Sequence, residues 1–228
     1  MEIDKRKKYI LMVDTETCPL NPGGKCNGDN SLVYDVGFLV TDKKGYVYAT
    51  GSYIVKEVFY GEEKRMKSAY YANKIAQYKK EISEGKRTVA TWQEIKNIIG
   101  KVCVENNVSV ICAHNARFDW LATRNTSLYL SNGRRSGFLP YLEIWDTMLM
   151  SRVIANTVTY KNFCIENNFL TKKGTPQIKA ETLYRFITRD TDFAESHTGL
   201  EDCFIERIIL IECLKKHKKM RKKLFEKK

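Results

Sequence analysis

The order of its strand-like segments constrains the fold of this chain most strongly. Three such segments come first, over residues 9–13, 33–41 and 46–55, and the short Gly-containing turn 42–45 joins the last two. Helical and strand-like segments alternate from about residue 91 onward. An antiparallel hairpin beside strand–helix–strand units is typical of a mixed sheet. We therefore expect an α/β domain with a mixed central sheet flanked by helices.

Apolar spacing and capping residues predict where the helices lie. Between residues 63 and 84, apolar side chains recur at helical spacing on one face. The residues of that face are Tyr71, Ile75, Tyr78 and Ile82. Thr91 and Glu94 have the spacing of a capping box that starts a helix running to about residue 106. The remaining expected elements are strands over 108–113 and 143–145, and helices from 116 onward, through 154, and near 160–167, 179–188 and 199–216.

Positive charge is concentrated at the end of the sequence. Nine Lys and Arg residues against one Glu give residues 215–228 a charge of +8, which leaves +4 for the rest of a chain whose net charge is +12. We predict a single domain over 1–214 followed by a basic tail over 215–228. Such a tail suits a polyanion such as nucleic acid, because binding releases condensed counterions. A solvated helix end explains the same composition and stays open.

Composition excludes several classes of protein. No apolar run is long enough to cross a bilayer, and the five apolar residues 9–13 are too few for a signal-peptide core. The seven cysteines are odd in number, scattered and without a C-x-x-C pattern, which indicates reduced thiols. We expect a cytoplasmic protein that does not contact a membrane.

The first candidate site is Asp14-Thr15-Glu16, which directly follows the first apolar run. Residues i and i+2 of a strand point to the same face, with Cα atoms about 6.6 Å apart. Both carboxylates therefore leave the sheet on one side, close enough together to bind one hard cation. Taken alone, such a pair is more typical of a solvent-facing turn.

The second candidate follows the strand over 108–113. Asn115 is a natural N-cap, and Asp119 lies in the first turn of the helix that it would start. In an α/β sheet, such turns gather at the carboxyl edge of the strands, where ligands bind. An ordinary capped helix with an acidic first turn explains the pattern equally well.

The third candidate starts the last helix. Thr198 and Glu201 have capping-box spacing, so we expect Thr198 to be the N-cap. His197 then precedes the cap, Asp202 is the fourth helical residue, and capping geometry brings the two near each other. The helix is strongly apolar and should be buried, so Asp202 needs partners there.

Together these segments supply four carboxylates, from Asp14, Glu16, Asp119 and Asp202. Oxygen ligands of this kind suit Mg²⁺ or Mn²⁺, and four crowded anions repel one another without cations. His197 adds a base that is neutral near pH 7. The set predicts a metal-assisted phosphodiester hydrolase.

Three motifs in this order resemble those of the DEDD exonuclease superfamily: D-x-E at 14–16, H-N-x-x-F-D at 114–119 and H-x-x-x-x-D at 197–202. The histidine five residues before the last aspartate is similar to its His subfamily, DEDDh, which includes the epsilon-type proofreading exonuclease subunit of bacterial DNA polymerase III. The resemblance implies a ribonuclease H-like fold. It also implies 3′→5′ hydrolysis that releases nucleoside 5′-monophosphates, in a role such as DNA replication or repair.

The resemblance also implies residue roles. Asp14 would bridge two Mg²⁺ or Mn²⁺ ions, and Glu16 and Asp202 would hold the ion that carries the attacking water. Asp119 would act largely through metal-bound waters. His197 would be the general base.

The same resemblance suggests how a substrate would bind. Thr15 and Thr17 would lie near the terminal nucleotide, and Asn115 would support the site by hydrogen bonding. Phe118 would lie beside the terminal base, although a place in the core at the helix start suits it as well. We expect single-stranded DNA rather than RNA as the substrate, because H-N-x-x-F-D is most similar to proofreading relatives. The alternatives are an exoribonuclease of the same family and a catalytically silent nucleic-acid-binding module.

Two segments are longer than the resemblance requires, the loop 17–31 and the segment 56–90. The second carries aromatic and basic residues, which can stack on bases and contact phosphates. Packing of an amphipathic helix explains Tyr71 and Tyr78 better. Asp146, at a strand-to-helix junction, is expected to be a structural N-cap. A polymerase or other protein partner is not identified by any of these features.

Overall fold

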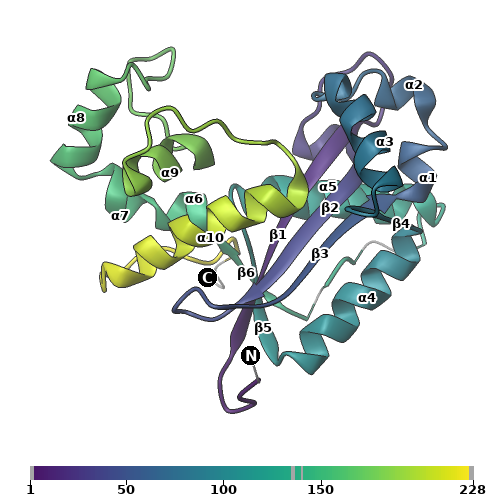
Figure 1. The fold of residues 1–228 in the computed structure, drawn as a ribbon, viewed down its shortest axis with the longest axis horizontal. Coiled ribbons are helices and arrows are strands. Elements are labelled where there is room, and N and C mark those ends of the chain that lie inside the picture. Colours follow the sequence, from purple (N-terminus) through teal and green to yellow (C-terminus); the bar gives the residue numbers. More distant parts are fainter. Residues whose placement is uncertain (1–2, 135–136, 140, 226–228) are drawn as a thin grey trace.

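The computed structural model describes residues 3–134, 137–139 and 141–225, and a six-stranded sheet runs through its centre (Figure 1). The strand order is β4-β3-β2-β1-β5-β6. The strands are β1 (Tyr9–Pro19), β2 (Ser31–Thr41), β3 (Val47–Val55), β4 (Thr88–Ala90), β5 (Val108–Ala113) and β6 (Glu143–Asp146).

The sheet is mixed, as the sequence predicted. β1, β2 and β3 pair antiparallel, whereas β5 runs parallel to β1 and β6 runs parallel to β5. The parallel edge strand β4 was not predicted, because three residues are too few to show a period-two pattern.

Strand β1 is longer than the sequence indicated. The expected strand stopped at residue 13, but pairing with β2 continues to the pair Pro19 and Ser31. Polar residues therefore continue the strand, and Thr15, Glu16 and Thr17 are buried within it. A cross-strand ladder holds them there, and apolar periodicity does not reveal such a ladder.

Two hydrophobic cores lie on the two faces of the sheet. Alternate residues of β1 point to opposite cores: Leu11 and Val13 to one, and Ile10 and Met12 to the other. The first core contains residues of α1 (Lys56–Phe59), α2 (Glu63–Met66), α3 (Ile75–Ser83), α4 (Trp92–Glu105) and α5 (Ala116–Leu130). The second contains residues of α6 (Thr147–Met150), α7 (Arg152–Ala155), α8 (Val158–Glu166), α9 (Ala180–Thr188) and α10 (Gly199–Lys215).

The helix expected over 63–84 is interrupted. Helix α2 ends at Met66, and the short 3₁₀ turn η2 (Ala72–Lys74) precedes α3. The Ser68 hydroxyl donates to the Lys64 carbonyl and accepts a hydrogen bond from the Gly23 amide. Such local side-chain bonds compete with helix propagation. The capping box of Thr91 and Glu94 forms as predicted.

The described part of the basic tail folds back onto the sheet. The Asp146 amide donates to the Lys222 carbonyl at 2.8 Å, and the Leu224 amide donates to the Ile144 carbonyl at 2.9 Å. These bonds cover the outer edge of β6, which would otherwise present unpaired backbone groups. The boundary expected at residue 215 coincides with the end of α10, but the independence of domain and tail stays a prediction. Among the described residues, no helix is both long and apolar enough to span a bilayer.

Candidate active site

Three carboxylates converge beside the sheet. Oxygen atoms of Asp14, Glu16 and Asp202 all lie within 4.8 Å of one another. Asp14 and Glu16 continue the face of β1 that packs against α10, and Asp202 lies in the first turns of that helix. The expected pairing of the two β1 carboxylates on one face is therefore observed, although they lie inside the strand and not after it.

Two glycines allow α10 to approach the strands this closely. Gly37 lies opposite Asp14 in the β1–β2 ladder. A Cβ atom on Gly37 would lie 1.9 Å from the carbonyl carbon of Gly199, and one on Gly199 would lie 2.5 Å from the Gly37 amide nitrogen. Because neither residue has a side chain, the helix start rests on the backbone beside Asp14 and delivers Asp202 to the cluster.

The start of α10 is fixed by a bond that the sequence did not predict. Thr198 is the N-cap, as expected, but its hydroxyl donates to the Glu201 carboxylate at 2.7 Å instead of accepting a backbone bond. The expected capping box is therefore wrong. Asp35 of β2 takes over its role and accepts a hydrogen bond from the Gly199 amide at 3.0 Å.

Asp35 is itself held by buried partners. It accepts hydrogen bonds from the Tyr78 hydroxyl at 2.8 Å and from Arg87 at 3.2 Å. Arg87 is also buried and pairs with Glu81 and Glu201. One sign of this network was visible in the sequence: Asp35 is a charged residue within the apolar run 31–41. A carboxylate buried in such a strand needs hydrogen-bond partners.

Asp119, in the first turn of α5, lies beside Thr15 of β1. The Thr15 hydroxyl points toward α5 and donates to the Asp119 carboxylate at 2.7 Å. Asp119 is outside the group of three, yet its charge still raises the pKa of Asp14. Thr15 was expected near a terminal nucleotide, and in the structure its hydroxyl positions Asp119. Thr17 is buried in β1, with its carbonyl 3.6 Å from the Cys26 sulfur.

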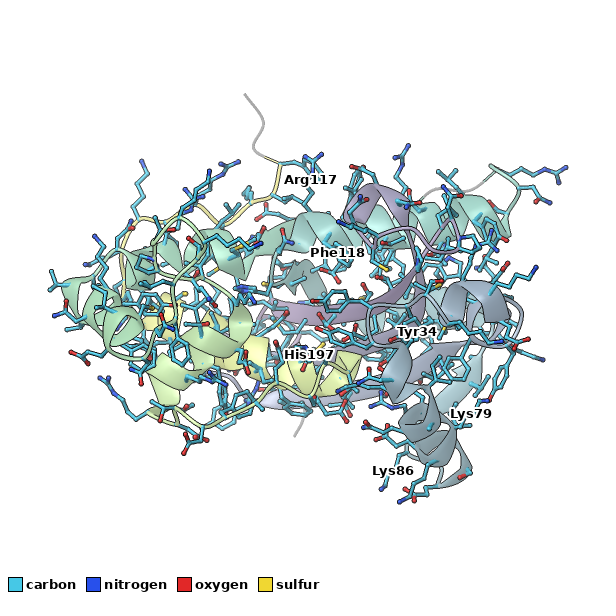
Figure 2. The ribbon with its side chains drawn as sticks, turned by 90° about the horizontal axis from the view of Figure 1, so that it is seen from above. Tyr34, Lys79, Lys86, Arg117, Phe118 and His197 are labelled. Carbon is cyan, nitrogen blue, oxygen red and sulfur yellow. The ribbon has the colours of Figure 1, made fainter. Side chains whose placement is uncertain are left out.

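The turn before α5 differs from its expected form. Asn115 occupies the N-cap position but has a left-handed backbone, with φ at 62°, and its side chain makes no capping bond. The Asn115 backbone N–H instead donates to the Asp146 carboxylate. Asp146 caps α6 as predicted, by accepting hydrogen bonds from the backbone amides of Met148 and Leu149. Phe118 is half-buried on the first turn of α5. In Figure 2, Phe118 and His197 lie on opposite sides of β1.

His197 precedes α10 on irregular backbone with φ at 51°. Its ring stacks on Tyr71, with centroids 4.4 Å apart and planes 14° apart, and Nδ1 lies 3.5 Å from a Glu195 oxygen. The neighbouring Ser196 hydroxyl donates to Asp202 at 3.2 Å. Burial, and then the charge of Lys74, lower the pKa of His197, so the neutral imidazole is favoured.

The carboxyl groups resist ionisation together. Burial raises the pKa values of Asp14 and Glu16 well above normal, that of Asp119 to about 7 and that of Asp202 to about 8. Repulsion between the acids adds to the effect at each of Asp14, Glu16 and Asp202. A divalent cation would relieve both penalties.

A fifth acid, Glu206, was not identified from the sequence. It lies one turn after Asp202, is 3 % exposed, and exerts the largest charge effect on the pKa of Asp14. Its Oε2 atom has no hydrogen-bond partner among the described residues. An orphaned buried oxygen beside clustered carboxylates fits a site that takes up positive charge. The sequence signal was an acid at i+4 from Asp202 on a buried helix.

No family model and no curated protein matches the sequence. Among solved structures, E. coli Exonuclease I in complex with a dA16 oligonucleotide matches with a TM-score of 0.50 and 13% identity. This match covers 88% of this chain but only 39% of that one. A second match is a 3′-exonuclease that recognises the 3′ end of a histone mRNA stem-loop. It has a TM-score of 0.57 and 12% identity, and the match covers 94% of this chain and 85% of that one. The likeness confirms the predicted ribonuclease H-like fold.

Proposed function

We propose that this protein is a metal-dependent 3′→5′ exonuclease of the DEDDh type that removes nucleoside 5′-monophosphates from single-stranded DNA. One observation carries the proposal: the oxygens of Asp14, Glu16 and Asp202 lie within 4.8 Å of one another on a fold shared with exonucleases. Fold alone does not determine function, so the weight rests on this acidic site. The intact acids favour an enzyme over a silent binding module.

Asp14, Glu16 and Asp202 would hold Mg²⁺ or Mn²⁺, with Asp119 supporting a second ion. Their hard oxygen donors match these cations. When bound, the ions would supply an activated water and stabilise the departing 3′ oxygen. The Thr15 hydroxyl fixes the orientation of Asp119 for this task.

His197 would accept the proton of the attacking water. Its Nδ1 faces the Glu195 carboxylate, which favours a proton on Nδ1 and leaves Nε2 free to act as the base. The lowered pKa of His197 keeps the imidazole neutral at physiological pH. General-base catalysis of this kind contributes roughly 10²- to 10⁴-fold to a rate.

The half-buried ring of Phe118 would stack on the terminal base of the bound nucleic acid. Thr17 and Asn115 would contact the same terminal nucleotide. An exoribonuclease is the second candidate. It is favoured by the likeness to a 3′-exonuclease that recognises the 3′ end of a histone mRNA stem-loop. Contacts to the 2′-hydroxyl decide between the two.

Digestion of matched 5′-labelled DNA and RNA oligonucleotides tests the proposal. With Mg²⁺ or Mn²⁺, the wild-type protein should shorten one of them stepwise from the 3′ end, and EDTA should stop the reaction. Asp14→Asn should lose about 10³-fold or more in rate, because it removes several kcal/mol of metal-dependent stabilisation. The matched control Asp190→Asn changes an exposed acid and should keep the wild-type rate. Undigested DNA and RNA in every lane would refute the nuclease.

A further inference from the structure

The environment of His197 comes from a segment outside all three motifs. Tyr71, which immediately precedes η2, covers one face of the imidazole in a near-parallel stack at 4.4 Å. Residues 193–198 form no helix or strand, so regular backbone hydrogen bonds do not fix this histidine. A ring on such a segment changes rotamer readily unless a neighbouring group restrains it.

Lys74, one turn further along, ties the same two segments together. Its Nζ donates to the Ser196 carbonyl and lies 5.8 Å from the centroid of the Tyr71 ring. The lysine therefore bonds the backbone next to His197 while facing the ring that stacks on it. Two side chains of residues 71–74 thus hold residues 196–197 from one direction.

Tyr71 differs from the other aromatic residue expected on the same helix face. Tyr78 is fully buried in the core, where its hydroxyl bonds Asp35. Tyr71 is half-buried and lies near the acidic cluster: burial first, then the charge of Glu16, raise its pKa. Tyr78 therefore packs in the hydrophobic core, as the amphipathic helix pattern predicted. The contact of Tyr71 with His197 instead points to a role at the acidic site.

We propose that Tyr71 is a positioning residue for His197, whose ring it holds in one orientation while Lys74 anchors the Ser196 carbonyl. This inference rests on the proposed exonuclease function. Misplacing a reacting group by about 1 Å costs up to about 100-fold in rate. The stack therefore determines how often the base is in a productive orientation.

Kinetics in a double-mutant cycle test the role. Tyr71→Ala should lower kcat roughly 10- to 100-fold with KM within about twofold, and Tyr71→Phe should restore most of the rate because the stack needs only the ring. In the His197→Ala background, Tyr71→Ala should have no further effect, because a positioning residue acts through its target. Tyr46→Ala, at an exposed tyrosine of the β2–β3 turn, is the control.

Additive losses in the cycle, or a raised KM with unchanged kcat, would overturn the proposal; the second result would make Tyr71 a substrate-binding residue. An NMR measurement works without activity. The His197 ring protons should carry a ring-current shift that Tyr71→Ala removes and Tyr71→Phe keeps. A shift that Tyr71→Ala leaves unchanged would refute the stack. If the wild-type protein digests no nucleic acid, the proposed function fails, while the NMR result still decides the contact.

Discussion

The two sides of the site are built in different ways. Asp14 and Glu16 belong to a strand that pairs with β2 along this stretch and with β5 as far as Met12. Asp202 belongs to a helix that packs closely on the backbone because Gly37 and Gly199 lack side chains. His197 lies on irregular backbone and is held by side chains from residues 71–74. The position of the proposed metal ligands thus depends on the sheet, and the position of the proposed base depends on a segment outside the motifs. Substitutions on the two sides should therefore affect metal affinity and turnover separately.

The largest expected effect that separates the two sides is at His197. His197→Ala should lower kcat by roughly 10²- to 10⁴-fold, the contribution of a general base, and leave the affinity for Mn²⁺ within about twofold. Steady-state kinetics and calorimetric Mn²⁺ titration measure the two quantities. A parallel loss of Mn²⁺ affinity would place His197 among the ligands and erase the distinction between the sides.

The next largest effect is expected where the start of α10 packs against Gly37 of β2. Gly37→Ala places a Cβ atom against the backbone of Gly199, so α10 must move and carry Asp202 away. We expect a loss of about 1–3 kcal/mol in the free energy of unfolding, the usual cost of overpacking, together with weaker Mn²⁺ binding.

Gly100→Ala is the matched control, because among the described residues the new Cβ in the middle of α4 meets only the Tyr141 hydroxyl, at 4.0 Å. It should stabilise the protein by about 0.5–1 kcal/mol. Urea unfolding measures both variants. Equal free energies of unfolding for Gly37→Ala and the wild-type protein would contradict the close approach of α10 to β2 at Gly37 and Gly199.

Removal of metal should expose the free-energy cost of ionising Asp202, which comes first from its burial and then from repulsion by nearby acids. The pKa of Asp202 is about 8 in the folded chain against the usual 3.8. This group therefore contributes stability that is complete below about pH 3.8 and is lost as the pH rises through about 8. In EDTA at pH 9, Asp202→Asn should melt higher than the wild-type protein, by roughly 2–8 °C, since about 1 kcal/mol corresponds to about 2–4 °C at this size. The difference in Tm should shrink at pH 5. A lower Tm for Asp202→Asn than for the wild-type protein at pH 9 would refute this cost of ionisation.

The smallest effect concerns the basic tail. Lys218→Gln with Lys219→Gln removes two exposed charges outside the stretch that pairs with β6. If both contact phosphates, the slope of log affinity for single strands against log salt should fall by roughly 1.4. Lys43→Gln with Lys44→Gln, in the β2–β3 turn, should not change it. An unchanged slope in the tail variant would show that these lysines do not bind the strand.

Features that depend on residues close together in the chain could be predicted from the sequence. The hairpin, the strand before Asp119, the cap by Asp146 and the pairing of Asp14 with Glu16 on one strand face all follow from residues close together in the chain. Contacts between distant residues could not be found this way. Asp35 and Gly199 are 164 positions apart, yet their bond replaces the capping box expected at Thr198.

The same limit explains the other errors. The left-handed backbone of Asn115 accompanies a hydrogen bond from its backbone N–H to Asp146, at the end of β6. The break before Tyr71 places that ring on His197, which is 126 positions later by the numbering of the chain. Glu206 carried a sequence signal only as a charge within an apolar helix, and Arg87, in the loop between α3 and β4, carried none. Which partners would satisfy them depends on the completed fold.

The central claim is that Asp14, Glu16 and Asp202 share a divalent cation. Anomalous X-ray scattering from crystals soaked in Mn²⁺ tests it most directly. We expect a manganese peak within coordination distance of oxygens from all three carboxylates, and its loss in Asp14→Asn. Crystals that diffract well and show no peak between these residues would exclude a shared cation.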